Sequence, residues 1–263
     1  MNWFEALVLG LIQGLTEFLP ISSSGHLALA DAFLGVKPAE SLYFTIVVHG
    51  ATVLSILFVF WQEISQLTKG VFQFGMNDEM KYAGKIVVSM IPVIVLGIFF
   101  QDFIENMFAG NLVALGIQFL ITALLLGLAH FIRPRERNIS YLDSFIIGIA
   151  QAIAVVPAIS RSGATIATAL LLGDKKEEAV KFSFLMVIFP VIGANLMEML
   201  KAGTVAESIS ILSIIIGFFT AFISGYFACK WMILLVKKSK LIWFAIYCTI
   251  IGILSILLSQ NGG

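Results

Sequence analysis

The chain has 263 residues, of which 59% are hydrophobic and only 12% are charged, and its formal net charge is zero. Soluble domains carry about 25% charged residues, so this composition excludes a soluble domain and predicts an integral membrane protein. The balanced charge argues against nucleic acid as a partner, because nucleic-acid-binding domains carry a basic excess. The two cysteines, Cys229 and Cys248, lie in apolar runs and are expected to pack as small hydrophobic residues.

The first apolar segment, residues 3–19, contains Glu17 and is short for a membrane crossing, which takes about 20 apolar residues. Pro20 ends this helix, and the serines after it can cap a second one. That second helix, from Gly25 to Leu34, is about half the length of a crossing. Two short helices around a polar turn predict a re-entrant hairpin, whose irregular backbone needs protein or a wet cavity around it.

Residues 144–156 and 162–172 repeat this pattern around Pro157 and predict a second re-entrant hairpin. The remaining apolar runs are long enough to cross the membrane. The expected crossings are Leu42–Trp61, Ile86–Phe100, Leu112–Ile132, Phe182–Leu200, Ile209–Val236 and Leu241–Ser259. The predicted fold class is therefore an all-α polytopic membrane protein, in which each half has one hairpin and three transmembrane helices.

The two halves resemble each other at an offset of 138 residues. The matching pairs are Gly10 with Gly148, Gln13 with Gln151, Ser22 with Ser160, Ser24 with Ser162, Gly25 with Gly163 and Gly35 with Gly173. Several matches of polar or special residues in one register disfavour chance, and weak internal symmetry is typical of membrane folds built from two repeats. We expect one membrane domain, residues 1–263, made of inverted repeats at approximately 1–133 and 138–263.

Lysine and arginine are distributed unequally between the two sides of this arrangement. One side receives Lys37 and Lys201, and the other receives Lys69, Lys81, Lys85, Arg133, Arg135, Arg137, Lys175, Lys176, Lys181, Lys237, Lys238 and Lys240. Because cytoplasmic loops carry the basic excess, both termini are expected to face outward from the plasma membrane. The tips of the inverted hairpins can then meet near the midplane, in a site open to the outer side.

Gln13 and Glu17 are four residues apart and share one face of the first helix. A buried carboxylate beside an amide suits coordination of a divalent cation, or the role of a general base. The simpler alternative is a structural Glu17 that is hydrogen-bonded to the polar turn. We favour the functional interpretation, because ionisable residues at membrane depth are costly and usually mark a site.

Two turns rich in serine and glycine predict anion sites, since each places backbone N–H groups at the start of a helix. Arg161 adds a planar charged group suited to phosphate oxygens. For Ser22 and Ser162, plain helix capping is an equally good interpretation. The predicted phosphate ligands are Ser22, Ser160, Arg161, Ser162, Gly163 and Thr165.

His26 follows the first turn, where an imidazole could attack phosphorus or move a proton. The alternative is a hydrogen-bonded structural histidine, although the neighbouring Glu17 and phosphate turn favour function. His49 and Asp31 are expected to have mainly structural or rim roles. Asp143 is expected to cap a helix.

The motifs Gln-x-x-x-Glu, Phe-Leu-Pro-Ile-Ser-Ser-Ser-Gly-His and Pro-Ala-Ile-Ser-Arg-Ser-Gly-Ala-Thr resemble those of the undecaprenyl-diphosphate phosphatase family, also called the bacitracin-resistance family. The resemblance covers essentially the whole chain. It implies removal of the terminal phosphate from undecaprenyl diphosphate, with Mg2+ or Ca2+ as a divalent cation. The functional residues that it implies are Gln13, Glu17, Ser23, His26, Ser160, Arg161 and Thr165.

Two positions depart from the family pattern. Gln13 stands where many members have glutamate, so it offers a cation a carbonyl oxygen but no charge. Ala158 stands where the family usually has glycine, which costs stability if this position needs a positive φ.

Three classes of function are compatible with these features. We expect a phosphatase with a polyprenyl diphosphate lipid as substrate and the bilayer as partner, in which either His26 or Ser23 is the nucleophile. A lipid flippase or transporter without hydrolysis, or a dual role, is the alternative. A structural membrane subunit is the third and least favoured. The oligomeric state is open, with a homodimer as one possible form.

Overall fold

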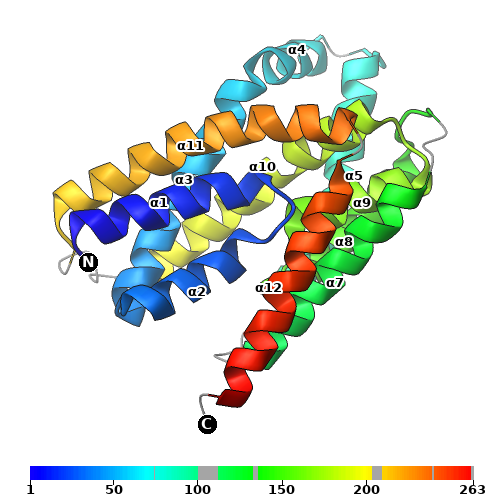
Figure 1. The fold of residues 1–263 in the computed structure, drawn as a ribbon. Coiled ribbons are helices and arrows are strands. Elements are labelled where there is room, and N and C mark those ends of the chain that lie inside the picture. Colours follow the sequence, from blue (N-terminus) through cyan, green and yellow to red (C-terminus); the bar gives the residue numbers. More distant parts are fainter. Residues whose placement is uncertain (74, 100–111, 133–135, 203–208, 239, 262–263) are drawn as a thin grey trace.

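The structure is a computed structural model that describes residues 1–73, 75–99, 112–132, 136–202, 209–238 and 240–261. Within these ranges the chain folds into eleven α-helices and no β-strand, apart from one isolated bridge between Arg137 and Asp174. Figure 1 shows that the helices form one bundle, with the turn that follows the first helix near its centre. The all-helical fold class is confirmed.

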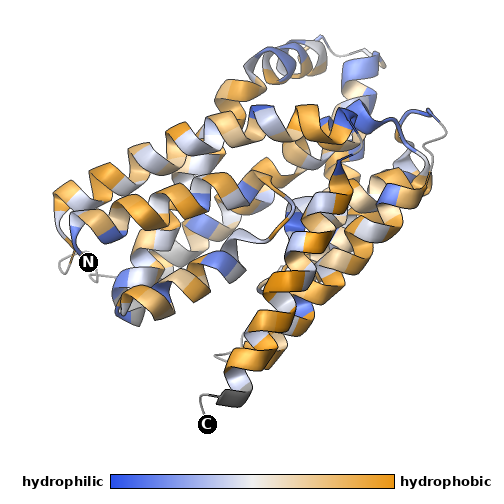
Figure 2. Ribbon diagram, viewed as in Figure 1, coloured by the Kyte–Doolittle hydropathy of each residue, from blue (hydrophilic) through white to orange (hydrophobic). Residues whose placement is uncertain are grey.

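Six helices are long and apolar enough to cross a membrane, as predicted. Their outward-facing side chains are largely apolar: Ile98 is 70% exposed and Ile211 is 75% exposed. Figure 2 shows that the long helices consist mostly of hydrophobic residues. Exposed apolar surface of this extent needs lipid around it, so this is a multi-pass membrane protein. The six are α3 (Pro38–Val59), α5 (Asp78–Phe99), α7 (Leu112–Phe131), α10 (Lys176–Ala202), α11 (Ile211–Lys237) and α12 (Leu241–Asn261).

Four shorter helices form the two predicted hairpins: α1 (Trp3–Phe18) with α2 (Ser23–Leu34), and α8 (Tyr141–Ile153) with α9 (Arg161–Leu172). The helices α2 and α9 have 12 residues each. At about 1.5 Å per residue each reaches about 18 Å, well short of the ~30 Å hydrocarbon core. Each hairpin can therefore enter the membrane only part of the way.

The local structure of the two hairpins follows the sequence repeat. Both first helices begin with a capping box, built by Asn2 with Glu5 and by Ser140 with Asp143. Both second helices end at a left-handed glycine, Gly35 in α2 and Gly173 in α9. The expected capping role of Asp143 is confirmed, whereas the inverted orientation of the halves stays a prediction.

Close backbone contact at matched glycines holds each hairpin in the bundle. The helix α1 packs on α11, and a Cβ added to Gly10 would lie 2.6 Å from the backbone oxygen of Gly217. Its counterpart α8 packs on α5, where a Cβ on Gly148 would lie 2.3 Å from the backbone oxygen of Ser89. Real Cβ contacts are longer, so any side chain at these positions would force the helices apart.

The sequence patterns did not predict α4 (Trp61–Val71), which packs against α5. Hydropathy identifies apolar runs, and α4 contains Gln62, Glu63 and Lys69. For the same reason, the observed α5 and α10 begin earlier than the expected crossings, because their first turns contain charged residues. Of the basic residues used to assign orientation, Arg133, Arg135 and the side chain of Lys201 lie outside the described residues.

Candidate active site

The tips of the two hairpins meet, so the motifs that are far apart in sequence form one site. The backbone N–H of Ala158 donates to Ser24 Oγ at 3.2 Å. In the opposite direction, Ser162 Oγ donates to the carbonyl oxygen of Leu19 at 3.4 Å. A third residue, Thr122 of α7, accepts the backbone N–H of Ser160 at 3.1 Å and so supports the second tip. Thr122 was not among the predicted site residues, because nothing in the sequence around it marks it.

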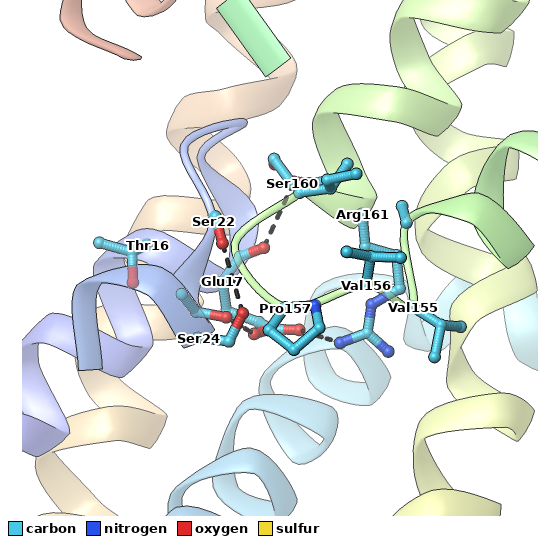
Figure 3. Close-up of a pocket in the computed structure, with 13 residues that line it drawn as sticks. Thr16, Glu17, Ser22, Ser24, Val155, Val156, Pro157, Ser160 and Arg161 are labelled. Carbon is cyan, nitrogen blue, oxygen red and sulfur yellow. Dashed lines mark hydrogen bonds and ion pairs between the residues drawn. The ribbon is translucent and has the colours of Figure 1, made fainter. Parts of the chain in front are cut away.

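A cavity of about 240 Å³ lies between the two tips and has polar and apolar walls. Figure 3 shows that side chains from both tips point toward it and that Glu17 and Arg161 approach each other across the site. The cavity is lined by Thr16, Glu17, Ser22, Ser23, Ser24, Ala154, Val155, Val156, Pro157, Ile159, Ser160, Arg161 and Ser162.

The Glu17 carboxylate is the centre of the hydrogen-bond network in this site. Its Oε1 accepts from Arg161 Nη2 at 3.2 Å. Its Oε2 accepts from Ser23 Oγ at 2.5 Å and from Gln13 Nε2 at 3.0 Å. A carboxylate with three donors, one of them a guanidinium, is stabilised in its charged form. The network links both hairpins through one side chain that is only 11% exposed.

Gln13 has the one buried acceptor in this network that is left without a partner. Its side chain is fully buried, and Oε1 has no hydrogen-bond partner within the described part of the chain. Most buried amide oxygens find a partner, so this orphaned oxygen requires an explanation. Amide and carboxylate oxygens are the ligands of hard cations. The donor set around Glu17 therefore fits a divalent cation.

The serines at the two helix starts cap their helices. Ser22 Oγ accepts the backbone N–H of Gly25 at 3.3 Å, and Ser160 Oγ accepts that of Gly163 at 3.1 Å. Capping uses one lone pair of each hydroxyl, and both serines still line the cavity. Both interpretations of Ser22 are therefore compatible with its position.

Two other predicted phosphate ligands lie outside the lining of this cavity. Gly163 contributes its N–H to the cap of α9, as described above. Thr165 Oγ1 bonds back to the carbonyl oxygen of Arg161 at 3.0 Å. Thr165 instead lines a smaller cavity on the other side of Glu17 and Arg161.

The structure does not bring His26 into the lining of the cavity. Its Nδ1 lies 2.7 Å from the carbonyl oxygen of Ser22, so this nitrogen carries the proton and donates it. Its Nε2 lies 2.7 Å from the hydroxyl of Tyr247 in α12, and the two rings are stacked. Both nitrogens therefore have partners, which leaves neither ready to attack a phosphorus atom.

His49 of α3, in contrast, reaches the site. Its Nε2 lies 3.6 Å from Glu17 Oε2, and its Nδ1 lies 2.9 Å from the carbonyl oxygen of Thr45. The role predicted for His49 from the sequence was mainly structural or at the rim of the site. The available signal was an ionisable group inside a membrane-spanning run, which is the signal that identified Glu17.

Ala158 has a φ of +63° and is fully buried in the turn of the second hairpin. A left-handed conformation costs a non-glycine residue about 1–2 kcal/mol. A Cβ added to Gly25 would lie 3.1 Å from the Ala158 methyl, so the two tips are in close contact here. The departure from glycine at this position therefore places strain in the wall of the site.

Sequence comparisons agree with the motifs that meet in this site. The family model of bacitracin resistance protein BacA matches residues 6–254. A protein of Bacteroides fragilis named undecaprenyl-diphosphatase is 54% identical over 99% of this chain and 99% of its own length. Proteins of that name from Parabacteroides distasonis, at 54%, and Carboxydothermus hydrogenoformans, at 39%, are also matched over at least 97% of both chains. The chain therefore belongs to the bacitracin resistance protein BacA family.

Proposed function

We propose that this protein is a membrane phosphatase that hydrolyses undecaprenyl diphosphate to undecaprenyl phosphate and phosphate, which returns the lipid carrier to cell-wall synthesis. The observation that carries the proposal is the contact of Ser23 with Glu17 and of Glu17 with Arg161 inside one cavity. A hydroxyl beside a carboxylate that can act as its base, with a guanidinium that can bind phosphate oxygens, is suited to phosphoryl transfer. The names of the full-length relatives support the choice of substrate.

Ser23 is the better candidate for the nucleophile, because its Oγ lies 2.5 Å from Glu17 Oε2 and it lines the cavity. As the Ser23 oxygen bonds to the terminal phosphorus, its proton passes to Glu17. The bond from that phosphorus to the bridging oxygen breaks, and the leaving lipid phosphate takes the proton from Glu17. A water molecule then donates a proton to Glu17, attacks the phosphoserine and releases phosphate, while the Ser23 oxygen regains its proton.

His26 lies outside the cavity and holds the turn that carries the proposed nucleophile. Its bond to the Ser22 carbonyl oxygen holds the turn that carries Ser23. Its bond to Tyr247 connects this turn to α12. We therefore assign His26 a positioning role in place of nucleophilic attack.

Arg161 is the group that binds the phosphate in this proposal. Its side chain is 28% exposed and lines the cavity, so it can turn from Glu17 to incoming phosphate oxygens. The hydroxyls of Ser22, Ser160 and Ser162 lie in the same wall and can donate further hydrogen bonds.

Glu17 and Gln13 would hold the Mg2+ or Ca2+, in line with the orphaned Gln13 Oε1. When bound, such a cation neutralises the charge that develops on the transferring phosphoryl group. The polyprenyl tail would lie in the lipid against the apolar outer surface. The proposal includes the expected orientation, in which both termini face the outer side of the membrane and the site opens to that side. It also includes a possible homodimer.

Phosphate release by the purified protein in detergent tests this function directly, because a micelle has no leaflets to flip between. We expect release from undecaprenyl diphosphate by the wild type and none above background by Ser23→Ala. Ser210→Ala is a suitable control, since Ser210 precedes α11 and makes no side-chain cap. Full activity of a folded Ser23→Ala protein would contradict the role of Ser23. No release by the wild type with any cation would favour the flippase alternative.

A further inference from the structure

His49 has no role in the function proposed above, yet its imidazole faces the Glu17 carboxylate. The side chains are 15% and 11% exposed, respectively, so both are shielded, and of the two Glu17 lines the cavity. The Nε2 to Oε2 distance of 3.6 Å is too long for a hydrogen bond. It is close to the distance between two atoms that share one metal ion. Ligands at about 2.0–2.2 Å from an ion, at a tetrahedral angle, lie roughly 3.4 Å apart.

The other nitrogen of His49 determines which atom faces Glu17. Nδ1 lies 2.9 Å from the carbonyl oxygen of Thr45, which can only accept, so Nδ1 carries the hydrogen. In the neutral imidazole, Nε2 then presents its lone pair to Glu17 Oε2. In that form two electron-rich atoms face each other, and a positive charge at this contact, either a metal ion between the two atoms or a proton on Nε2, makes it favourable. Metal-binding histidines commonly donate their second nitrogen to a backbone carbonyl in this way.

The Gln13 side-chain amide is a third group next to Glu17 Oε2. Its Nε2 lies 3.0 Å from Glu17 Oε2, while the fully buried Oε1 has no partner within the described residues. Rotation of the amide by 180° exchanges the two atoms and brings Oε1 beside the carboxylate without moving the helix. This exchange is unfavourable beside a bare carboxylate and favourable beside a cation.

We propose that His49 Nε2 is a direct ligand of the cation, together with Glu17 and Gln13 Oε1. A site with two oxygen donors and one imidazole binds Mn2+ or Zn2+ more tightly than Mg2+ or Ca2+, because imidazole is a poor ligand for hard ions. The inference rests on the proposed function, since it concerns the same cation site, and it adds a nitrogen ligand and a class of metal.

Pulsed electron paramagnetic resonance of the Mn2+-loaded protein detects a coordinated imidazole nitrogen directly and does not depend on turnover. The chain has three histidines, His26, His49 and His130, so the full set of variants is small when the affinity tag contains no histidine. We expect a nitrogen-14 coupling in the wild type and its loss in His49→Gln. His26→Gln and His130→Gln are the matched controls, and both should keep the coupling.

Calorimetric titration supplies the second measurement. His49→Gln should weaken Mn2+ binding by about 10–100-fold and Mg2+ binding by much less. Absence of nitrogen coupling in the wild type with bound Mn2+ would overturn the proposal, whether or not His49→Gln folds. Equal Mn2+ affinity of a folded His49→Gln protein would also overturn it. Phosphate release by the wild type distinguishes failure of this proposal from failure of the proposed phosphatase function. If the protein hydrolyses the substrate but shows no nitrogen coupling, only the role of His49 is contradicted.

Discussion

Glu17→Gln removes one negative charge from the centre of the site and keeps the size of the side chain. The carboxylate accepts from Ser23, Gln13 and Arg161, and an amide oxygen can replace it for only part of this set. General base catalysis contributes about 10²–10⁴ in rate, so kcat should fall at least 100-fold. Because the Arg161 side chain lines the cavity and can turn to other acceptors there, we expect the free energy of unfolding to fall by only about 1 kcal/mol.

The assay is phosphate release from undecaprenyl diphosphate, first at the cation concentration that saturates the wild type and then at higher concentrations. Folding is checked by size-exclusion chromatography. Recovery of activity with excess cation would assign Glu17 to cation binding, whereas lack of recovery assigns it to proton transfer. The matched control is Glu5→Gln in the same helix, because glutamine also serves in the capping box with Asn2. A folded Glu17→Gln protein with kcat within about tenfold of the wild type would refute the reasoning.

Further predictions concern the phosphate site, the cation, the Asp174 carboxylate and the orientation. Arg161→Lys keeps the charge but loses the planar group, so kcat/KM should stay at least tenfold below wild type in the phosphate assay. Gln13→Glu adds a carboxylate and should lower the Mg2+ concentration needed for half-maximal phosphate release. Burial, followed by the charge of Asp143, raises the pKa of Asp174 to about 6, whereas its value in the unfolded chain is about 3.9. Ionisation of Asp174 therefore lowers the stability of the folded protein as the pH rises between these two values. Asp174→Asn should therefore stabilise the protein at pH 7.5 by up to about 3 kcal/mol and have little effect at pH 4, as measured by chemical unfolding in detergent. An impermeant thiol reagent should label cells that carry Lys37→Cys and should not label those that carry Lys69→Cys.

Much of the fold could be predicted from the sequence because its signals are local. Length and hydropathy identify membrane-crossing helices without knowledge of their neighbours. Pro20 directly follows the C-cap of α1 and cannot continue that helix, and Ser22 and Ser160 cap the helices that follow the two turns. The repeat then indicated which two turns belong together, and their contact through Ser24 and Ser162 agrees with this.

The composition of the site depended on tertiary structure, because the direction of a side chain depends on how its helix is rotated and packed. His26 lies only three residues from Ser23, yet its ring points to Tyr247 of α12. His49 is remote in sequence and reaches Glu17 because α3 packs against α1.

The sequence alone therefore determined a two-hairpin membrane fold, the residues available for chemistry and the family pattern. Only the tertiary structure decided that Ser23 donates to Glu17 and that Ala158 adopts a positive φ. The physical reason is that helix ends and membrane crossings follow from interactions within a few residues. The surroundings of the Glu17 carboxylate, in contrast, come from α1, α2, α3 and α9, which are brought together only by packing.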